Sequence, residues 1–123
     1  MTLSFVDETT AGTRSPVFEI TVNTDFITVQ QLIEIRIHED ILRKKFDSNA
    51  LVNREMREAG IRASKGPSLP NEKTQVEVAC KAFLENRLLV LLKDRQATTL
   101  DERLPLSEGD EVSFLRLIPL IGG

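Results

Sequence analysis

Hydrophobic and polar residues alternate near the N-terminus in the way that β-strands require. Residues 2–6 (TLSFV) alternate, and residues 17–22 (VFEITV) are rich in β-branched and aromatic side chains. A polar stretch containing Gly12 and Pro16 separates the two segments. We therefore predict a β-hairpin. Its connection is longer than a two-residue turn, so the turn type alone does not fix the register.

The longest periodic segment is residues 27–46 (ITVQQLIEIRIHEDILRKKF). Thr28 and Gln31 have the spacing of a capping box, and Ile27 and Leu32 occupy the positions of a hydrophobic staple. The apolar positions of one helical face are Val29, Leu32, Ile33, Ile37 and Ile41. The middle of the segment, IEIRIH, also alternates like a strand. The length of the segment and the basic RKK near its end favour a helix.

A polar stretch rich in glycine and proline follows at residues 48–71, where NREMREA is compatible with a short helical turn and ASKGPSLP with a loop. Residues 74–86 (TQVEVACKAFLEN) then begin with a second capping box, Thr74 to Glu77. The apolar stripe of this segment is Val76, Ala79, Cys80, Phe83 and Leu84. We predict a second amphipathic helix here.

The C-terminal third contains two predicted strands. Residues 87–96 (RLLVLLKDRQ) include five consecutive apolar residues, which predicts a central strand covered on both faces. Residues 97–110 are predicted to be a connection with a turn at Ser107 to Asp110. Residues 111–120 (EVSFLRLIPL) form the last predicted strand, which Pro119 ends or places at an edge. These elements predict an α+β fold with helices on one face of the sheet.

Composition narrows the class of protein. The 123 residues, 41% hydrophobic and 28% charged, suit a single domain spanning 1–123. A net charge of −3 argues against nucleic acid or an anionic membrane surface as a partner. The first residues lack the pattern of a signal peptide, and no stretch is apolar for long enough to span a bilayer. Cys80 is the single cysteine, so we expect a reducing, cytoplasmic setting.

Few side chains suggest chemistry of their own. Cys80 is expected to be a small core residue, because it lies on an apolar stripe. His38 has no second histidine or cysteine near it in the sequence, so we expect a solvated face and no metal site. No Ser-His-Asp set is suggested, and no catalytic residue is expected. Seven charged residues are expected to lie on solvated faces. The alternative is that some of them form a surface that steers a partner: Glu34, Arg36, Lys44, Lys45, Asp101, Glu102 and Arg103.

The sequence given finishes with RLIPLIGG. Two final glycines arise by chance in roughly 0.5% of chains. A frayed end is the simplest interpretation. The alternative is that the carboxylate of Gly123 is the functional group, because glycine has no β-carbon to shield the carbonyl and Gly122 adds backbone freedom. Pro119 would stiffen the segment before the glycines and lower the ordering cost of docking.

The order of elements, with TVQQLIE, LLVLLKDRQ and LSEGDEVSFLRLIPLIGG, resembles the β-grasp fold of ubiquitin-like proteins. It most resembles the small sulfur carriers, namely the small subunit of molybdopterin synthase and the thiamine sulfur carrier, in which an L-x-x-GDEV turn leads to a Gly-Gly tail. The extra segment at 48–87 is similar to that of larger bacterial ubiquitin-like modifiers. The likeness covers 2–47 and 88–123 and implies a mixed sheet of about four to five strands, a main helix on one face and a flexible tail at 118–123. The segment 48–87, with its second helix, is then an insertion.

The resemblance also implies how the tail is used. An E1-like adenylating enzyme activates Gly123 with ATP and magnesium, so the chain itself holds no stable cofactor and no catalytic group. An E2-like protein, a JAB-type peptidase, and a target protein or sulfur-acceptor enzyme are the further partners. Residues 118–123 would need no proteolytic exposure if Gly123 is the native end. The candidate docking residues are Phe114, Leu115, Arg116, Leu117, Pro119, Leu120 and Ile121. Core packing is the expectation for two of Phe114, Leu115 and Leu117.

Three functions remain open at this point. In a protein modifier, the activated Gly123 passes through a thioester to a lysine. In a sulfur carrier, it becomes a thiocarboxylate, which the apolar LIPLI segment favours. In an unmodified β-grasp module, the protein works through surface contacts or edge-strand pairing. Of the three functions, the protein modifier is preferred, because a minimal sulfur carrier does not need the extra residues at 48–87.

Overall fold

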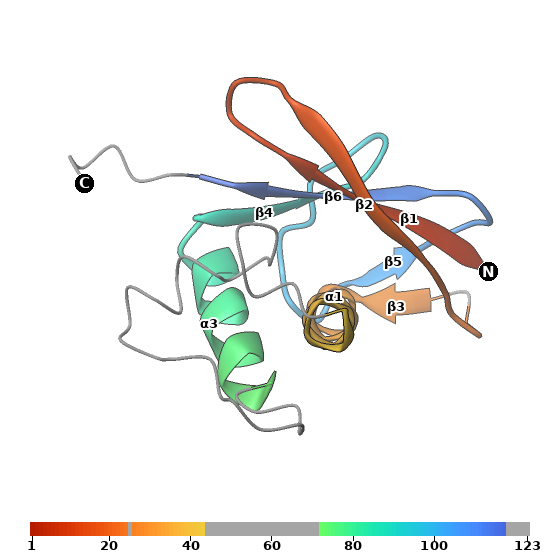
Figure 1. Ribbon diagram of the computed structural model, residues 1–123, viewed down its shortest axis with the longest axis horizontal. Coiled ribbons are helices and arrows are strands. Elements are labelled where there is room, and N and C mark those ends of the chain that lie inside the picture. The colour runs from red at the N-terminus through yellow and green to blue at the C-terminus, as the bar shows by residue number, and fades with distance from the viewer. Residues whose placement is uncertain (25, 44–71, 118–123) are drawn as a thin grey trace. The chain divides into compact units, whose positions relative to one another are not determined.

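The computed structural model describes residues 1–24, 26–43 and 72–117, which belong to two compact units (Figure 1). Met1–Val29 and Ala82–Gly123 form the first unit, and Gln30–Lys81 form the second. The first unit carries the strands, and the second carries most of the helical residues. Neither described helix is both long enough and apolar enough to cross a bilayer.

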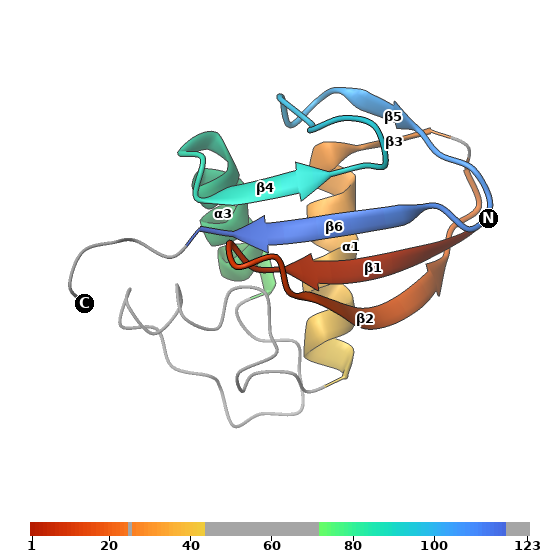
Figure 2. The same ribbon diagram turned by 90° about the horizontal axis from the view of Figure 1, so that it is seen from above.

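A mixed four-stranded sheet, in the order β2-β1-β6-β4, forms the body of the first unit (Figure 2). The pairing of β1 with β6 is parallel, whereas β1 with β2 and β6 with β4 are antiparallel. The strands are β1 Thr2–Glu8, β2 Arg14–Thr21, β4 Leu88–Leu91 and β6 Glu111–Arg116. The α+β class and the mixed sheet are therefore confirmed, whereas the finer β-grasp assignment and the helices on one face stay predictions.

The predicted hairpin is confirmed as β1 and β2, although β2 begins at Arg14 rather than at residue 17. The register shifts between Phe5, which pairs with Phe18, and Val6, which pairs with Pro16. This irregularity is a β-bulge in strand β2, which ends one side of the sheet, and bulges and prolines both limit further pairing at such an edge. The shift also decides which residues near the hairpin end share a face.

The prediction that residues 87–96 form a central strand is wrong, because β4 lies at one end of the sheet. Only its alternate residues Leu88 and Val90 are buried, and Leu89 and Leu91 are half-buried. The chain after β4 folds back onto it, since the Ala97 N–H donates to the Val90 carbonyl at 2.9 Å. The central positions go to β1 and β6, whose parallel pairing the apolar run in β4 did not reveal.

A second, two-stranded sheet was not predicted. It pairs β3 Phe26–Thr28 with β5 Arg103–Pro105, in a stretch that we expected to be a connection. Ile27 lies opposite Leu104 in the register, and both side chains are buried. Strands of three residues are too short to give a periodic signal, so only the long-range pairing identifies them.

Two helices are described, α1 Val29–Leu42 and α3 Glu72–Leu84. Helix α1 begins directly after Thr28, at the position predicted for its cap. Helix α3 begins two residues before Thr74, so the second capping-box prediction is wrong. Glu72 occupies its first turn, where a carboxylate interacts favourably with the helix N-terminus. The NREMREA and ASKGPSLP segments lie outside the described residues.

The stripe predicted for α3 is rotated by about one position. Leu84, expected to be inside, is 64% exposed, and Gln75 is buried instead. The fully buried positions of this helix are Gln75, Ala79, Ala82 and Phe83, which keep helical spacing. Apolar character alone therefore placed the stripe only approximately.

One face of the four-stranded sheet is a packed apolar layer. The ring of Phe5 lies 5.5 Å from that of Phe18 and 5.2 Å from that of Phe114, in tilted and edge-on arrangements that aromatic pairs prefer. Val112 and Val90 on the neighbouring strands are also completely buried. This face fixes β6 in place, and the opposite face of the same strands carries a different set of residues.

Candidate functional site

Strand β6 carries the candidate docking residues that the structure describes. Phe114 is 1% exposed and packs on Phe5, so it is a core residue rather than a surface one. Leu115, Arg116 and Leu117 are half-buried. The Leu117 N–H donates to the Arg87 carbonyl at 2.8 Å, which extends the pairing beyond β6. The other candidates lie outside the described residues: Pro119, Leu120, Ile121, Gly122 and Gly123.

The outward face of the sheet combines apolar and charged side chains. Residues directly opposite one another on neighbouring strands lie on the same face. Leu115 lies opposite Leu89 of β4, and Ser113 lies opposite both Leu91 of β4 and Val6 of β1. The pairings place three half-buried leucines of β4 and β6 together on this face, which we call the outward strip: Leu89, Leu91 and Leu115. Val6 lies on the same face but is only 3% exposed.

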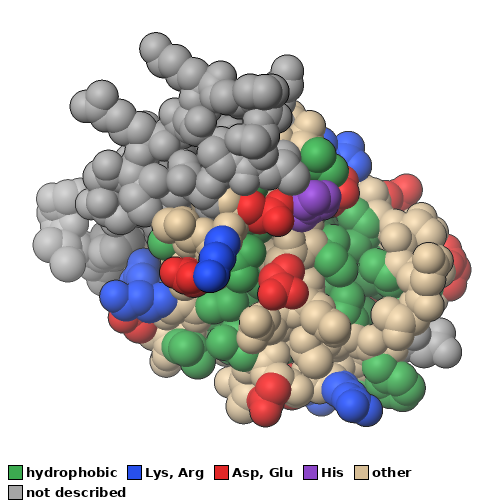
Figure 3. Space-filling model, turned by 90° about the horizontal axis from the view of Figure 1, so that it is seen from below, with side chains coloured by type: hydrophobic (Ala, Val, Ile, Leu, Met, Phe, Trp, Pro, Cys, Tyr) green, Lys and Arg blue, Asp and Glu red, His purple; other side chains and the backbone are tan. Residues whose placement is uncertain are grey.

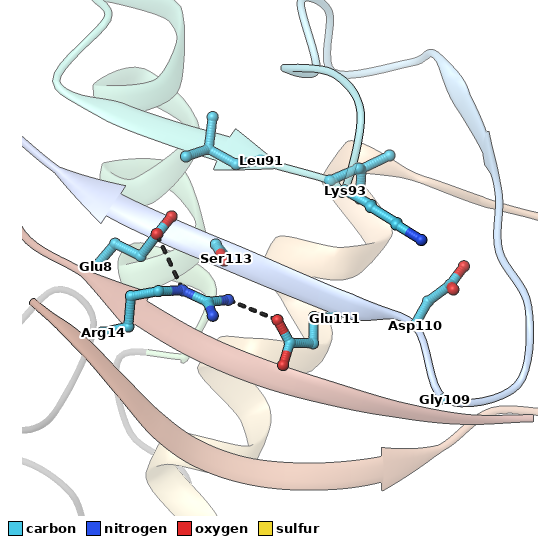
Figure 4. A pocket seen from close by; sticks show the side chains of 9 residues that line it. Glu8, Arg14, Leu91, Lys93, Gly109, Asp110, Glu111 and Ser113 are labelled. Carbon is cyan, nitrogen blue, oxygen red and sulfur yellow. Dashed lines mark hydrogen bonds and ion pairs between the residues drawn. The ribbon is translucent and has the colours of Figure 1, made fainter. Parts of the chain in front are cut away.

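This face is hollowed into a pocket of about 560 Å³ (Figure 4). Its lining comes entirely from the first unit: from the ends of β1, β2 and β4, the residues that follow β4, the turn before β6, and β6 itself. We call it the sheet-face pocket, and its lining residues are Glu8, Arg14, Leu91, Leu92, Lys93, Gly109, Asp110, Glu111 and Ser113.

A bridged ion pair spans the pocket. The Arg14 Nε donates to Glu8 Oε1 at 3.2 Å, and its Nη2 donates to Glu111 Oε1 at 2.5 Å, as the dashed lines in Figure 4 show. Hydrogen bonding and charge from Glu111, with a smaller contribution from Glu8, raise the pKa of Arg14. The three residues come from β2, β1 and β6, so the sheet register brings together groups that are distant in the sequence.

The turn before β6 forms another wall. The predicted turn at Ser107 to Asp110 is confirmed, because the Asp110 N–H donates to the Ser107 carbonyl at 3.0 Å and Gly109 has a φ of 84°. Asp110 Oδ2 accepts the Ser107 N–H at 2.8 Å, which fixes its carboxylate. The Gly109 N–H donates to the Thr2 carbonyl at 2.8 Å and anchors the turn to β1. The pocket therefore has a rigid acidic wall.

The sequence did not identify the pocket. Glu8, Arg14 and Lys93 were not singled out, because nothing in their local pattern distinguishes them from solvated residues. Glu8 and Glu111 are 103 positions apart in the sequence, and the parallel pairing of β1 with β6 places them on one face, where Arg14 bridges them. The single available signal was the GDEV turn, which locates one wall.

His38 lies on the surface, as predicted, with its side chain 45% exposed (Figure 3, purple). Its Nδ1 lies 2.7 Å from Oε1 of Glu72, a partner that the sequence did not suggest. In residues 1–24, 26–43 and 72–117, no three His, Cys, Asp or Glu side chains are arranged to hold a metal ion. His38 thus has a local hydrogen-bond partner within the second unit.

Two further expectations need revision. Cys80 is half-buried rather than a core residue, and burial, followed by the charge of Glu34, raises the pKa of its thiol. That direction disfavours the reactive thiolate. Arg36, expected on a solvated face, is 0% exposed and donates from Nε to Asp40 Oδ1 at 2.9 Å. The i,i+4 spacing of opposite charges beside the apolar face was the signal for this pair.

No protein-family model, curated protein or solved structure matches this chain. The case for a function therefore rests on the residues of the chain itself.

Proposed function

We propose that this chain is a ubiquitin-like protein modifier, whose Gly123 carboxylate is activated by an E1-like enzyme and transferred to a lysine of a target. The observation that supports it best is the position of β6. The strand that leads to Gly122 and Gly123 is paired on both sides, parallel with β1 and antiparallel with β4. Because β6 is hydrogen-bonded on both sides, it holds the start of the C-terminal segment at a fixed position, where a partner enzyme can bind it.

Chain length limits where that partner docks. Gly123 is six positions after Leu117, whose N–H is bonded to the Arg87 carbonyl. Six residues reach at most about 20 Å. An enzyme that takes Gly123 into its active site therefore approaches the end of β6. The half-buried Leu115 and Leu117 are the described residues that it would contact, and Phe114 is not one of them.

The chemistry needs activation because a carboxylate is a poor electrophile. In the proposed first step a Gly123 oxygen attacks the α-phosphate of ATP, and pyrophosphate leaves with its magnesium. A thiolate of the partner then attacks the carbonyl and AMP leaves, which gives a thioester. A lysine amine finally displaces the thiolate and forms an amide. The partner supplies the catalytic groups, and this chain supplies an unshielded glycine carbonyl.

The sulfur carrier is the second candidate. The apolar LIPLI segment before the glycines favours it, because the basic residues of the ubiquitin ending LRLRGG are missing here apart from Arg116. In that case sulfide or a persulfide displaces AMP, and the product is a thiocarboxylate. Activation of Gly123 is common to both candidates.

Intact mass spectrometry after incubation with ATP, magnesium and E1-like enzymes of the source organism tests the proposal. A covalent adduct to a lysine-bearing protein is expected for the modifier, and the replacement of one oxygen by sulfur for the carrier. Failure of every such enzyme to activate the chain, measured as ATP–pyrophosphate exchange, would leave the unmodified module.

Two variants provide the matched controls. Deletion of Gly122 and Gly123, and addition of one alanine after Gly123, are both expected to abolish activation, because each removes the terminal glycine carboxylate. Neither is expected to change the thermal midpoint. A large fall in the midpoint of the deletion variant would mean that the glycines are structural.

A further inference from the structure

We propose that the sheet-face pocket is a docking site for an arginine side chain of a protein partner, and that Arg14 occupies the position of this arginine until the partner displaces it. The proposal stands on the pocket and its charges. It does not depend on the activation of Gly123.

The charges of the pocket favour a guanidinium group. Three carboxylates, Glu8, Asp110 and Glu111, line it together with two cations, Arg14 and Lys93. Glu8 and Glu111 accept from the Nε and Nη2 of the same guanidinium, at 3.2 and 2.5 Å. The planar guanidinium group of an arginine has several N–H donors and can bind both carboxylates at once. The compact ammonium group of a lysine bridges separated carboxylates less well.

The shape and the apolar lining suit the rest of an arginine side chain. A volume of about 560 Å³ lies within the range of about 300–1,000 Å³ typical of ligand pockets. Leu91 and Leu92 line the pocket and can pack against the methylene groups of an arginine whose charged end reaches the carboxylates.

The resident arginine is easy to displace. The side chain of Arg14 is 49% exposed and that of Glu111 is 52% exposed. Exposed ion pairs contribute little to stability, because water solvates the separated groups almost as well. Lys93 comes from the opposite side of the pocket (Figure 4) and has no partner among the described residues, so it does not occupy the site between Glu8 and Glu111.

The occupant is part of a protein rather than a free small cation, because the pocket continues into the outward strip. Leu91 belongs to both, and Leu89 and Leu115 extend the apolar surface along β4 and β6. A partner chain that places its arginine in the pocket can therefore lay apolar neighbours on these leucines.

Titration of the 15N-labelled full chain with a capped Leu-Arg-Leu tripeptide tests the proposal. Backbone amide shifts of Gly109, Asp110, Glu111 and Ser113 are expected to change and saturate. The same peptide with citrulline, which has the shape of arginine without its charge, is expected to bind at least about threefold more weakly. Capped arginine alone is also expected to bind more weakly, because it lacks the flanking leucines.

Substitutions in the pocket test the proposal through the direction in which each one changes the affinity for the peptide. Glu111→Gln is expected to weaken peptide binding about threefold, and Arg14→Ala to strengthen it about threefold, because the competing guanidinium is gone. Asp101→Asn, an exposed acid outside the pocket, is the charge-matched control and is expected to change nothing. Equal binding of the citrulline peptide, or weaker binding by Arg14→Ala, would overturn the proposal. Equal binding of capped arginine would overturn its protein-docking part.

Discussion

Two arginine–carboxylate groups in this protein use the same chemistry in opposite surroundings. In α1, Arg36 and Asp40 pair at 2.9 Å with exposed fractions of 0% and 2%. On the sheet face, Arg14 bridges Glu8 and Glu111 with about half of its side chain in solvent. Removing one partner of the buried pair takes a charge-assisted hydrogen bond away from a group that water cannot reach, whereas the exposed group can exchange partners with water or with another protein. Burial, rather than residue type, separates a structural pair from a recognition site.

The largest expected effect is the removal of Asp40. Asp40→Ala leaves the guanidinium of Arg36 buried without this carboxylate and is expected to lower the free energy of unfolding by about 3–5 kcal/mol. Urea denaturation followed by circular dichroism measures this loss. Glu39→Ala is the matched control, since Glu39 lies on the same helix and forms a partly exposed i,i+4 pair at 3.0 Å with Arg43, which directly follows α1. We expect a change below about 0.5 kcal/mol. Equal effects of the two substitutions would contradict the comparison.

Glu102 is an intermediate case, with a side chain 18% exposed. Its Oε1 accepts the N–H groups of Thr98 and Thr99 at 2.6 and 3.1 Å, and its other oxygen pairs with Arg95. Glu102→Ala leaves those backbone donors to water and is expected to lower the free energy of unfolding by about 1–2 kcal/mol. Hydrogen exchange at the two threonine amides should accelerate. Asp101→Ala, in the same loop, is the control and should change neither the free energy of unfolding nor the exchange rates. Unchanged hydrogen exchange at the Thr98 and Thr99 amides in the Glu102 variant would contradict this account.

Gln75 is the opposite case to Arg36, because it is a buried polar side chain whose amide nitrogen lacks a partner among the described residues. It is 1% exposed, and its Nε2 has no hydrogen-bond partner within residues 1–24, 26–43 and 72–117, so this buried polar group lacks the partner that Arg36 has. Gln75→Met keeps a similar volume and is expected to raise the free energy of unfolding by about 1 kcal/mol. Lys73→Met introduces the same residue at an exposed position of α3 and should have no such effect. Destabilisation by Gln75→Met would show that the amide is satisfied after all.

The smallest expected effect is the loss of Arg14. Arg14→Ala should change the melting temperature very little, because its ion pairs are solvated. Differential scanning fluorimetry at low and at high salt measures this, with Arg43→Ala, at the exposed residue that directly follows α1, as the control. A melting temperature that falls by many degrees would place Arg14 with Arg36 as a structural group and would argue against its displacement by a partner.

Local signals in the sequence were sufficient where neighbours along the chain decide the structure. The hairpin, the start of α1 after Thr28 and the turn at Ser107 to Asp110 depend on alternation, capping and turn chemistry within a few residues. The edge position of β4 and the pairing of β3 with β5 depend instead on partners far away in the sequence. The apolar run of β4 gave no information about which strand lies beside it.

The candidate functional residues also fall into two groups, those that the sequence identifies and those that only the tertiary structure brings together. The sequence alone drew attention to Gly122 and Gly123, because a glycine pair after an apolar run is a local pattern that is recognised without any distant partner. It also determined the α+β class, since alternation and helical spacing follow from the backbone geometry of each element. Only the tertiary structure placed Phe114 in the core, buried Arg36, and joined Glu8, Arg14 and Glu111 on one face. The physical reason is that burial and sheet register are properties of contacts between distant segments, and a pattern along the chain does not contain them.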